Sequence, residues 1–246
     1  MKIAVIIPTY NESDSIGGIL DELQNEFRQI PNHDFTVLVV DANSTDGTAE
    51  IIKELGRKYK NVNLLVEARK RGLGMAYILG MNYAISELKS DAIMEFDGDR
   101  QHDPREIKKL VAAFDEGNNY VIGSRYVPGG EIPDEWSKHK KILSKYGSLF
   151  IKNALNLPTN DNTSGFKLAR VANFAEKLPL DEDRILSRLH AYKIHLLYEM
   201  QKMGAKTKEV PIKFSERTGG SSKSTFMDIL ESLKVVLILK MRELRK

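Results

Sequence analysis

Short apolar runs that alternate with segments of helical periodicity constrain this fold more than any other feature of the chain. We expect five strands, at residues 2–7, 35–40, 62–66, 92–96 and 120–123. Between them, residues 15–28, 46–60, 73–88 and 104–116 carry apolar side chains at helical spacing. Strands that are apolar throughout need cover on both faces. The pattern therefore predicts an α/β fold with a mostly parallel central sheet flanked by helices.

The second half of the chain is less regular. Residues 127–136 are rich in Gly and Pro and are expected to form a loop, as are 158–164 and 216–224. We expect helices at 140–155, 185–203 and 226–244, and a strand at 207–214. No linker separates the two halves, so we expect one domain over residues 1–223, followed by an amphipathic helix within residues 224–246.

Composition narrows the setting in which the chain works. Its 246 residues are 41% hydrophobic and 29% charged, which is typical of a globular protein and not of a disordered one. The absence of cysteine excludes disulfides and thiolate metal sites and suits a cytoplasmic location. The apolar N-terminus is too short for a signal peptide. No apolar run approaches the roughly 18–20 residues that span a bilayer, so we expect any membrane contact to be peripheral, at the cytoplasmic face.

Charge is distributed unevenly along the chain. The net charge is only +3, yet residues 202–246 hold 11 Lys or Arg against 5 Asp or Glu. Such a basic segment suggests anionic partners, either phosphates or a membrane surface; the simpler alternative is a solvated helix face. Nucleic acid is not among the partners that we expect.

Polar clusters follow four of the expected strands. They lie at residues 9–12, 41–46, 97–103 and 124–125. In open parallel sheets, ligands bind beyond the carboxyl ends of the strands. The four clusters are therefore expected to meet at one binding site.

The acidic turn Asp97-Gly98-Asp99 carries the strongest chemical signal. Two carboxylates that close together can hold a hard divalent cation, and Mg²⁺ takes its remaining ligands from water and substrate phosphates. An alternative is that the acidic turn serves only to cap the helix that begins at Pro104. The tripeptide alone does not decide between these interpretations.

The motifs together resemble glycosyltransferase family 2, and within it the dolichol or polyprenol phosphate mannose synthases, which have the GT-A fold. Seven segments carry the resemblance in order: Pro-Thr-Tyr-Asn-Glu at 8–12, Val-Val-Asp-Ala-Asn-Ser-Thr-Asp-Gly-Thr at 39–48, Gly-Leu-Gly-Met-Ala at 72–76, 97–104, Gly-Ser-Arg-Tyr at 123–126, Thr-Ser-Gly-Phe at 163–166 and Arg-Thr-Gly-Gly-Ser-Ser-Lys at 217–223. Each is weak alone, but their order is specific, and the resemblance covers essentially the whole chain to Lys223.

The resemblance implies a role for individual residues. The residues implied to bind the nucleotide are Pro8, Tyr10, Glu12 and Asp41 at the base and ribose, with Arg69 and Gly74 beside them. The implied ligands of Mg²⁺ or Mn²⁺ are Asp97, Asp99 and Gln101, and Asp99 is also implied in catalysis. The residues implied to face the acceptor phosphate or the transferring sugar are Arg125, Ser144, Arg217 and Lys223, of which Arg125, Arg217 and Lys223 are expected to be catalytic.

The implied reaction is an inverting, metal-dependent transfer of mannose from GDP-mannose to a polyprenyl or dolichyl phosphate. UDP-glucose remains an alternative donor, because Ala42 stands where family members often have Asp and His195 where they usually have Glu. A hydroxyl acceptor would need a general base, for which Asp183 is the candidate. Residues 181–183 could instead cap the helix expected at 185–203. A non-catalytic nucleotide-sugar-binding subunit is a third alternative.

The C-terminal helix has two interpretations. One face carries an apolar stripe of Phe226, Ile229, Leu230, Leu233 and Leu237, and the helix ends in Lys240, Arg242, Arg245 and Lys246. The stripe could pack on the domain core. It could equally lie on an anionic membrane surface with the basic end against lipid headgroups.

Overall fold

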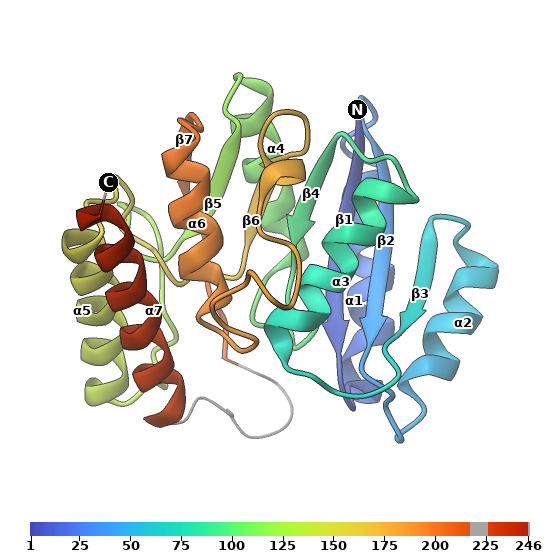
Figure 1. Ribbon diagram of the computed structural model, residues 1–246. Helices are drawn as coiled ribbons and strands as arrows, with labels where there is room; N and C mark the ends of the chain where they lie inside the picture. The colour runs from blue at the N-terminus through green and yellow to red at the C-terminus, as the bar shows by residue number, and fades with distance from the viewer. Residues whose placement is uncertain (217–225, 246) are drawn as a thin grey trace.

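A seven-stranded sheet with helices on both faces forms the body of the protein (Figure 1). The computed structural model describes residues 1–216 and 226–245. Its strands are β1 (Lys2–Thr9), β2 (Asp34–Asp41), β3 (Val62–Val66), β4 (Ala92–Glu95), β5 (Tyr120–Ser124), β6 (Lys167–Arg170) and β7 (Thr207–Pro211). Its α-helices are α1 (Ser13–Phe27), α2 (Thr48–Lys58), α3 (Leu73–Ser86), α4 (Ile107–Asp115), α5 (Lys138–Ala154), α6 (Tyr192–Lys202) and α7 (Phe226–Leu244). Two 3₁₀ turns, η1 (Pro104–Glu106) and η2 (Ala175–Lys177), complete the described elements.

The strand order β3-β2-β1-β4-β6-β5-β7 places the first strand near the middle of the sheet. β1 pairs in parallel with both β2 and β4, and β5 pairs in parallel with β7. Only β6 runs against its neighbours β4 and β5. The carboxyl ends of β1, β2, β4 and β5 therefore share one edge of the sheet, as the sequence predicted.

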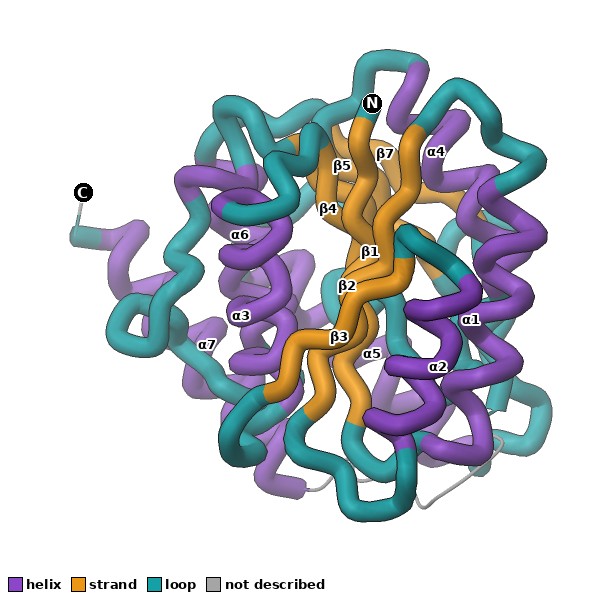
Figure 2. The backbone as a smooth tube through the Cα atoms, turned by 90° about the vertical axis from the view of Figure 1, so that its right-hand side faces the viewer, coloured by secondary structure: helices purple, strands orange, loops and turns teal. Residues whose placement is uncertain are grey.

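Side-chain alternation along the strands divides the core into two layers. Ile3, Val5 and Ile7 of β1 pack with α1, α2 and α4, whereas Ala4 and Ile6 pack with α3, α6 and α7. Figure 2 shows the sheet between these two groups of helices. Each fully buried Ile or Leu contributes roughly 2 kcal/mol by leaving water. The predicted α/β architecture with a mostly parallel sheet is confirmed.

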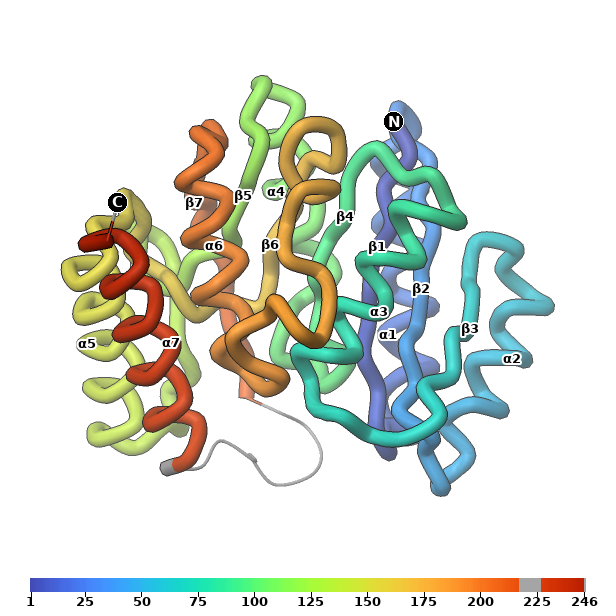
Figure 3. Tube along the Cα trace, viewed as in Figure 1, coloured from blue at the N-terminus to red at the C-terminus, as the bar shows by residue number. Residues whose placement is uncertain are grey.

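The structure differs from the predicted elements most at two places. The helix expected at 185–203 begins only at Tyr192, because residues 186–188 are held in other contacts. The N–H of Gly74 donates to the carbonyl of Arg188 at 2.9 Å, and the N–H of Leu186 donates to His195 Nδ1 at 3.3 Å. This loop thus crosses to the start of α3, as the trace in Figure 3 shows. The second difference is β6, for which the sequence predicted no element.

Helices α5 and α7 lie side by side at the β7 end of the molecule (Figure 1). Val235, Val236 and Leu239 bury α7 against the core, and Lys202 on α6 pairs with Glu243 at 2.8 Å. The domain boundary expected at residues 223 and 224 falls outside the described residues. Among the described helices, none has both the length and the apolar character needed to cross a bilayer.

The outer surfaces of α5 and α7 expose large apolar side chains. On α5 these are Ile142, Leu143, Tyr146, Leu149 and Phe150, each at least 45% exposed. On α7 they are Met227, Leu230, Leu233, Leu237, Met241 and Leu244. We call these eleven residues the apolar face. The stripe expected on α7 does not face the core, because Leu230, Leu233 and Leu237 are exposed. The residues of α7 that the core receives, Val235, Val236 and Leu239, lie outside that stripe.

Candidate functional site

A pocket of about 690 Å³ opens where the carboxyl ends of β1, β4 and β5 meet α5 and α7. Residues 8–10, residues 97–99 and Gln101 line it on the sheet side. Its opposite part is lined largely by apolar side chains of the two helices, among them Leu143, Ile151, Ile229, Leu233 and Val236. The pocket therefore joins a polar end, rich in carboxylates, to an apolar end.

Asp97 is held in place by groups of both charges. Its Oδ1 accepts a hydrogen bond of 2.7 Å from the Tyr77 hydroxyl. Its Oδ2 lies 3.7 Å from His102 Nε2 and 3.8 Å from Lys193 Nζ. Burial would raise the pKa of Asp97, but the charge of Lys193 and the Tyr77 hydrogen bond outweigh it and lower the pKa to about 2. This carboxylate is ionised at neutral pH.

His102 fixes the turn that carries both aspartates. Its Nδ1 accepts a 3.0 Å hydrogen bond from the backbone N–H of Asp97, which leaves the ring proton on Nε2. The ring packs against Phe96, Phe166 and Phe214. Burial lowers the pKa of His102 to about 4, so it is neutral at pH 7.

The rest of the turn is fitted closely against the end of β1. A Cβ at Gly98 would lie 3.1 Å from Ile7 Cγ2 and 3.3 Å from the carbonyl oxygen of Pro8. Arg100 adopts a left-handed conformation with φ of 64°, and the N–H of Gln101 donates to Asp99 Oδ1 at 3.1 Å. This conformation brings Asp97, Asp99 and Gln101 to one wall of the pocket. Asp103 accepts from the N–H of Arg105 and thereby caps η1, so capping and the pocket use different carboxylates.

The donor set of this wall suits a hard divalent cation that is shared with a ligand. Asp97, Asp99 and Gln101 supply oxygen ligands, which Mg²⁺ and Mn²⁺ prefer. Within residues 1–216 and 226–245, no group of three His, Cys, Asp or Glu side chains could hold a metal alone. Two carboxylates and one amide leave positions that water and phosphates normally fill. The residues therefore fit a cation that binds together with a diphosphate.

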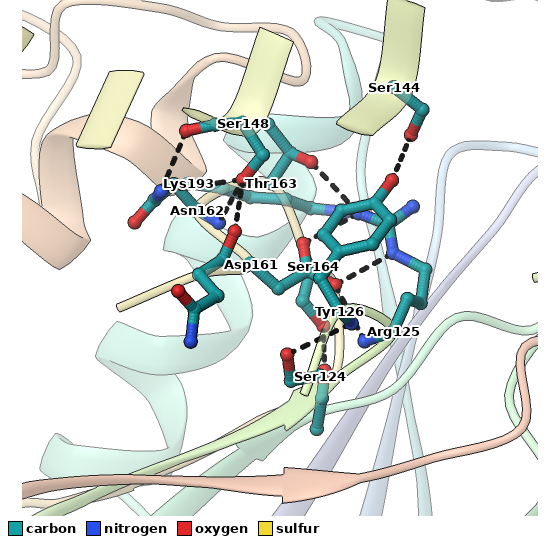
Figure 4. Close-up of polar contacts among 12 residues, drawn as sticks. Ser124, Arg125, Tyr126, Ser144, Ser148, Asp161, Asn162, Thr163, Ser164 and Lys193 are labelled. Atoms are coloured by element: carbon teal, nitrogen blue, oxygen red, sulfur yellow. Dashed lines mark hydrogen bonds and ion pairs between the residues drawn. The ribbon is translucent and has the colours of Figure 1, made fainter. Parts of the chain in front are cut away.

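Arg125 follows β5 and lines the same pocket. Its Nε and Nη2 lie 2.8 and 2.7 Å from the carboxylate of Asp161, and Nη2 also donates to Thr163 Oγ1 at 2.9 Å (Figure 4). Burial opposes the charged form, but Asp161 raises the pKa of Arg125 above its usual range. With Nε and Nη2 engaged, Nη1 is the nitrogen that can turn to a ligand. Next to it, the hydroxyls of Tyr126 and Ser144 lie 2.5 Å apart.

The comparison with protein families decides what kind of site this is. The sequence model of Glycosyl transferase family 2 matches residues 4–176, which include both carboxylates and Arg125. The chain belongs to glycosyltransferase family 2. It is thus a glycosyltransferase, as the order of its motifs predicted.

Curated relatives cover nearly the whole of this glycosyltransferase. The undecaprenyl-phosphate mannosyltransferase of Micrococcus luteus is 34% identical over 223 residues, which is 91% of this chain and 87% of the relative. The polyprenol monophosphomannose synthase of Mycolicibacterium smegmatis is 33% identical over 94% of this chain and 84% of its own length. The dolichol-phosphate mannosyltransferase of Pyrococcus furiosus is 32% identical over 95% of this chain, which spans only 62% of that relative.

Solved structures confirm the GT-A fold of the glycosyltransferase. Mannosyl-3-phosphoglycerate synthase from Rubrobacter xylanophilus superposes with a TM-score of 0.67 over 100% of this chain and 74% of its own, at 19% identity. A mannosyltransferase from Pyrobaculum calidifontis in complex with GDP-Man and Mn²⁺ gives a TM-score of 0.58 over 99% of this chain and 64% of its own, at 16% identity. At these identities the likeness concerns the fold alone.

Most of the predicted site residues lie together in the glycosyltransferase. Those that line the pocket are Pro8, Tyr10, Glu12, Asp97, Asp99, Gln101, Arg125 and Ser144. Three others do not line it. Asp41 is fully buried and accepts from Thr9 Oγ1 at 2.9 Å, Arg69 is exposed, and Gly74 is packed under the carbonyls of residues 188 and 189. Arg217 and Lys223 lie outside the described residues.

Asp183 and His195 also lie away from the pocket lining. Asp183 is exposed, and the interpretation that residues 181–183 cap a helix was wrong, because α6 starts nine residues later, at Tyr192. His195 is 1% exposed and accepts from Leu186, so it positions the preceding loop.

Several residues of the pocket were missed at the sequence level. Lys70, Lys140, Thr163, His190 and Lys193 all line it. Only Thr163 lay within a motif. A single lysine on an amphipathic helix carries no signal in the sequence, because the same pattern is typical of a solvated face.

Proposed function

We propose that this glycosyltransferase transfers mannose from GDP-mannose to a polyprenyl phosphate with the help of a divalent cation. One observation carries the proposal: the pocket has the carboxylates of Asp97 and Asp99 at one end and an apolar lining from α5 and α7 at the other. A substrate that matches both ends carries a phosphate joined to a hydrocarbon. The names of the relatives, which are mannosyltransferases of polyprenyl or dolichyl phosphate, support the same pair of substrates.

The nucleotide is proposed to bind at the end of β1. Pro8, Tyr10 and Glu12 line the pocket there, and Lys70, which also lines it, has its Nζ over the Tyr10 ring at 3.6 Å from the centroid. Asp41 is buried behind these residues and holds the end of β1 in place, because it accepts hydrogen bonds from the Thr9 hydroxyl at 2.9 Å and from the Ser44 hydroxyl at 2.6 Å. Its role is therefore proposed to be the shape of the nucleotide site.

The reaction is proposed to be a single displacement. An oxygen of the acceptor phosphate forms a bond to the anomeric carbon of the sugar while the bond to the donor diphosphate breaks. The leaving nucleoside diphosphate takes up the electron pair of the broken bond. Because the acceptor oxygen attacks from the side opposite the leaving group, the configuration at the anomeric carbon inverts. A cation at Asp97, Asp99 and Gln101 would neutralise the charge that the leaving group gains. Arg125, through Nη1, is placed to orient an anionic oxygen in the pocket.

The geometry favours a phosphate acceptor over a hydroxyl acceptor. A hydroxyl needs a base within hydrogen-bond reach, and the candidate Asp183 is exposed and does not line the pocket. A phosphate is already an anion and needs no base. The buried cations Arg125 and Lys193 are suited to such an anion.

The apolar face of α5 and α7 supports peripheral binding to a membrane. It adjoins the apolar end of the pocket, since Leu143, Phe150 and Leu233 belong to both. Lys138, Lys141 and Lys145 on α5 and Arg242 on α7 accompany it, as expected for contact with anionic headgroups. An acceptor embedded in the bilayer could then reach the carboxylates without leaving the lipid.

A donor and acceptor screen tests the proposal. The protein is incubated with radiolabelled GDP-mannose or UDP-glucose, Mg²⁺, and either a short polyprenyl phosphate or the matching polyprenol, and label extracted with the lipid is counted. We expect label only with GDP-mannose and the phosphate, and Asp183→Asn to retain most activity. Label transferred from UDP-glucose and not from GDP-mannose would show that the proposed donor is wrong. Label on the free polyprenol, lost by more than about a hundredfold in Asp183→Asn, would replace the mechanism by general base catalysis.

A further inference from the structure

Lys193 is a buried cation in the pocket to which no motif assigns a role. It lies in the first turn of α6, its side chain is 7% exposed, and its Nζ is 3.8 Å from Asp97 Oδ2. This distance is too long for a hydrogen bond. A lysine at the amino end of a helix also faces the positive end of the helix dipole. Its position is therefore unfavourable unless negative charge lies close to it.

Within the described part of the chain, the ammonium has none of the hydrogen-bond acceptors that burial normally requires. Among residues 1–216 and 226–245, no side chain or carbonyl accepts a hydrogen bond from Lys193 Nζ, and the carboxylate of Asp97 is its only ion-pair partner. A buried ammonium has three donors to satisfy. Because Lys193 lines the pocket, a ligand can supply the missing acceptors.

The backbone around Lys193 makes room for the ammonium. A Cβ at Gly165 would lie 2.4 Å from Lys193 Nζ and 2.7 Å from Asp97 Oδ2, so any side chain there would displace one of them. From the other side, Lys167 Nζ donates to the carbonyl oxygen of Lys193 at 3.3 Å and is itself buried. These contacts fix the place of the ammonium next to Asp97.

A divalent cation at Asp97 would change the balance of charge around Lys193. Without a cation, the carboxylate of Asp97 pairs with Lys193. If the same carboxylate also binds a divalent cation, the cation and the Lys193 ammonium lie close together and repel each other. A phosphate that enters beside them relieves the repulsion and gives the ammonium its acceptors.

We propose that Lys193 is a positioning residue that binds a phosphate group of the substrates and makes cation binding at Asp97 conditional on that phosphate. The phosphate can belong to the donor diphosphate or to the acceptor monoester. Lys193 then weakens cation binding in the empty pocket and strengthens it when the phosphate is present. This inference rests on the proposed function for the identity of the ligands, but the coupling itself does not require turnover.

The test measures binding, not activity. Mn²⁺ is titrated into the full-length protein and free Mn²⁺ is followed by electron paramagnetic resonance, without additive, with GDP and with farnesyl phosphate. For Lys193→Gln we expect Mn²⁺ alone to bind about tenfold more tightly, and the enhancement by one of the two phosphates to fall by a similar factor. Loss in the GDP arm assigns the lysine to the donor, and loss in the farnesyl phosphate arm assigns it to the acceptor.

Matched variants make the result specific. Lys193→Arg should keep the native coupling. If Lys193→Gln folds poorly, Lys193→Met takes its place, and the same changes in Mn²⁺ affinity are expected for it. Lys140→Gln removes another pocket lysine, which rests on the Trp136 ring at 4.1 Å, and should leave the affinity for Mn²⁺ alone unchanged. Equal Mn²⁺ affinity and equal enhancement by both phosphates in native protein and Lys193 variants would overturn the inference. The proposed function would stand or fall separately on the lipid-linked product.

Discussion

Arg125 and Asp161 form a bidentate ion pair inside the protein, with Nε 2.8 Å from Oδ2 and Nη2 2.7 Å from Oδ1. The arginine side chain is 8% exposed and the aspartate is fully buried. Asp161 also accepts from the backbone N–H of Arg125 at 2.9 Å. The pair therefore anchors the segment after β5 to the loop before β6, and it sets the direction in which Arg125 faces the pocket.

Asp161→Asn should destabilise the protein by about 3–5 kcal/mol, because it leaves the Arg125 charge buried without its partner. Urea unfolding at pH 7 measures the loss. Burial alone would raise the pKa of Asp161, but the charge and hydrogen bonds of Arg125 outweigh burial and hold that pKa below its usual range. The stability from the pair is therefore present at neutral pH and is lost as the pH falls through that lowered pKa. Unchanged stability of the variant at pH 7 would contradict a structural role for the pair.

Asp99→Asn should reduce turnover by orders of magnitude and leave the fold intact, because it removes a carboxylate from the proposed cation site. Asp99 is a cleaner choice than Asp97, which also holds Tyr77. The assay is sugar transfer with Mg²⁺ or Mn²⁺, with a thermal melt as the fold control and the exposed Asp14→Asn as the matched charge control. EDTA should abolish native activity and added cation restore it. Full activity in excess EDTA would remove the cation from the mechanism.

His102 should make the protein less stable as the pH falls from about 6.5 to about 4. Burial holds its folded pKa at about 4, so the unfolded chain binds the proton first and is favoured across this window. The shift corresponds to a loss on the order of 3 kcal/mol at most. Urea unfolding at several pH values should show a smaller slope for His102→Asn, which keeps an acceptor for the N–H of Asp97. The exposed His139→Asn should retain the native slope.

Gly147→Leu should block the apolar end of the pocket. Gly147 lines the pocket from α5, and a Cβ placed there meets no heavy atom within 4 Å. Leucine is also the better helix former, by roughly 0.5–1 kcal/mol, so the melting temperature should not fall. We expect kcat/KM for a polyprenyl phosphate to drop at least about tenfold, as expected when bulk fills a pocket that must hold substrate.

Two comparisons make the Gly147 result specific. Hydrolysis of GDP-mannose by water, which needs no lipid, should be unaffected by the substitution. Asn153→Leu adds the same side chain to an exposed position of α5 that does not line the pocket, and it should transfer sugar like the native protein. Native transfer by Gly147→Leu would mean that the lipid binds elsewhere.

The basic residues of α5 and α7 should bind the protein to anionic liposomes in a salt-sensitive way. Lys145, Arg242 and Arg245 are exposed, and near an anionic surface each is worth about 1 kcal/mol. In flotation assays, changing all three to Gln should reduce binding to the liposomes. As a control, changing Lys53 on α2 and Lys60 just after it to Gln should leave binding unchanged. Lys246, which was expected to contribute, lies outside the described residues.

The same assay separates membrane contact from core packing. Leu237 is 62% exposed, so Leu237→Gln should leave the melting temperature unchanged and weaken flotation. If Leu237 instead packed on the domain core, the variant would have a lower melting temperature and would float with liposomes like the native protein. Equal flotation of native and triple Gln variants would end the membrane proposal for these helices.

The sequence predicted those features that depend on local pattern. The apolar runs of β1, β2 and β4 identified the buried strands, and the motifs identified Asp97, Asp99 and Arg125. The pattern failed where distant contacts decide. β6 is only four residues long and contains Lys167, which is buried because Glu95 and the carbonyl of Lys193 surround its charge. No local rule places a lysine in a central strand.

The start of α6 shows a second limit. Residues 185–191 have an apolar spacing compatible with a helix, yet Arg188 accepts from Gly74, more than one hundred residues earlier. Likewise, the wall of the pocket that α5 and α7 form could not be predicted, because each helix alone is only amphipathic. Lys193 became recognisable only once its distance to Asp97 was known.

The place of α7 in the chain has a consequence for biosynthesis. A chain that emerges from the ribosome amino end first can complete the sheet, and with it the polar end of the pocket, once β7 is available. The apolar end then still lacks one wall, and the part of the core that packs on Val235, Val236 and Leu239 faces water until α7 docks on α6. Because α7 follows β7 in the chain, it covers a surface that would otherwise favour aggregation, and it completes the apolar end of the pocket only after the polar end exists.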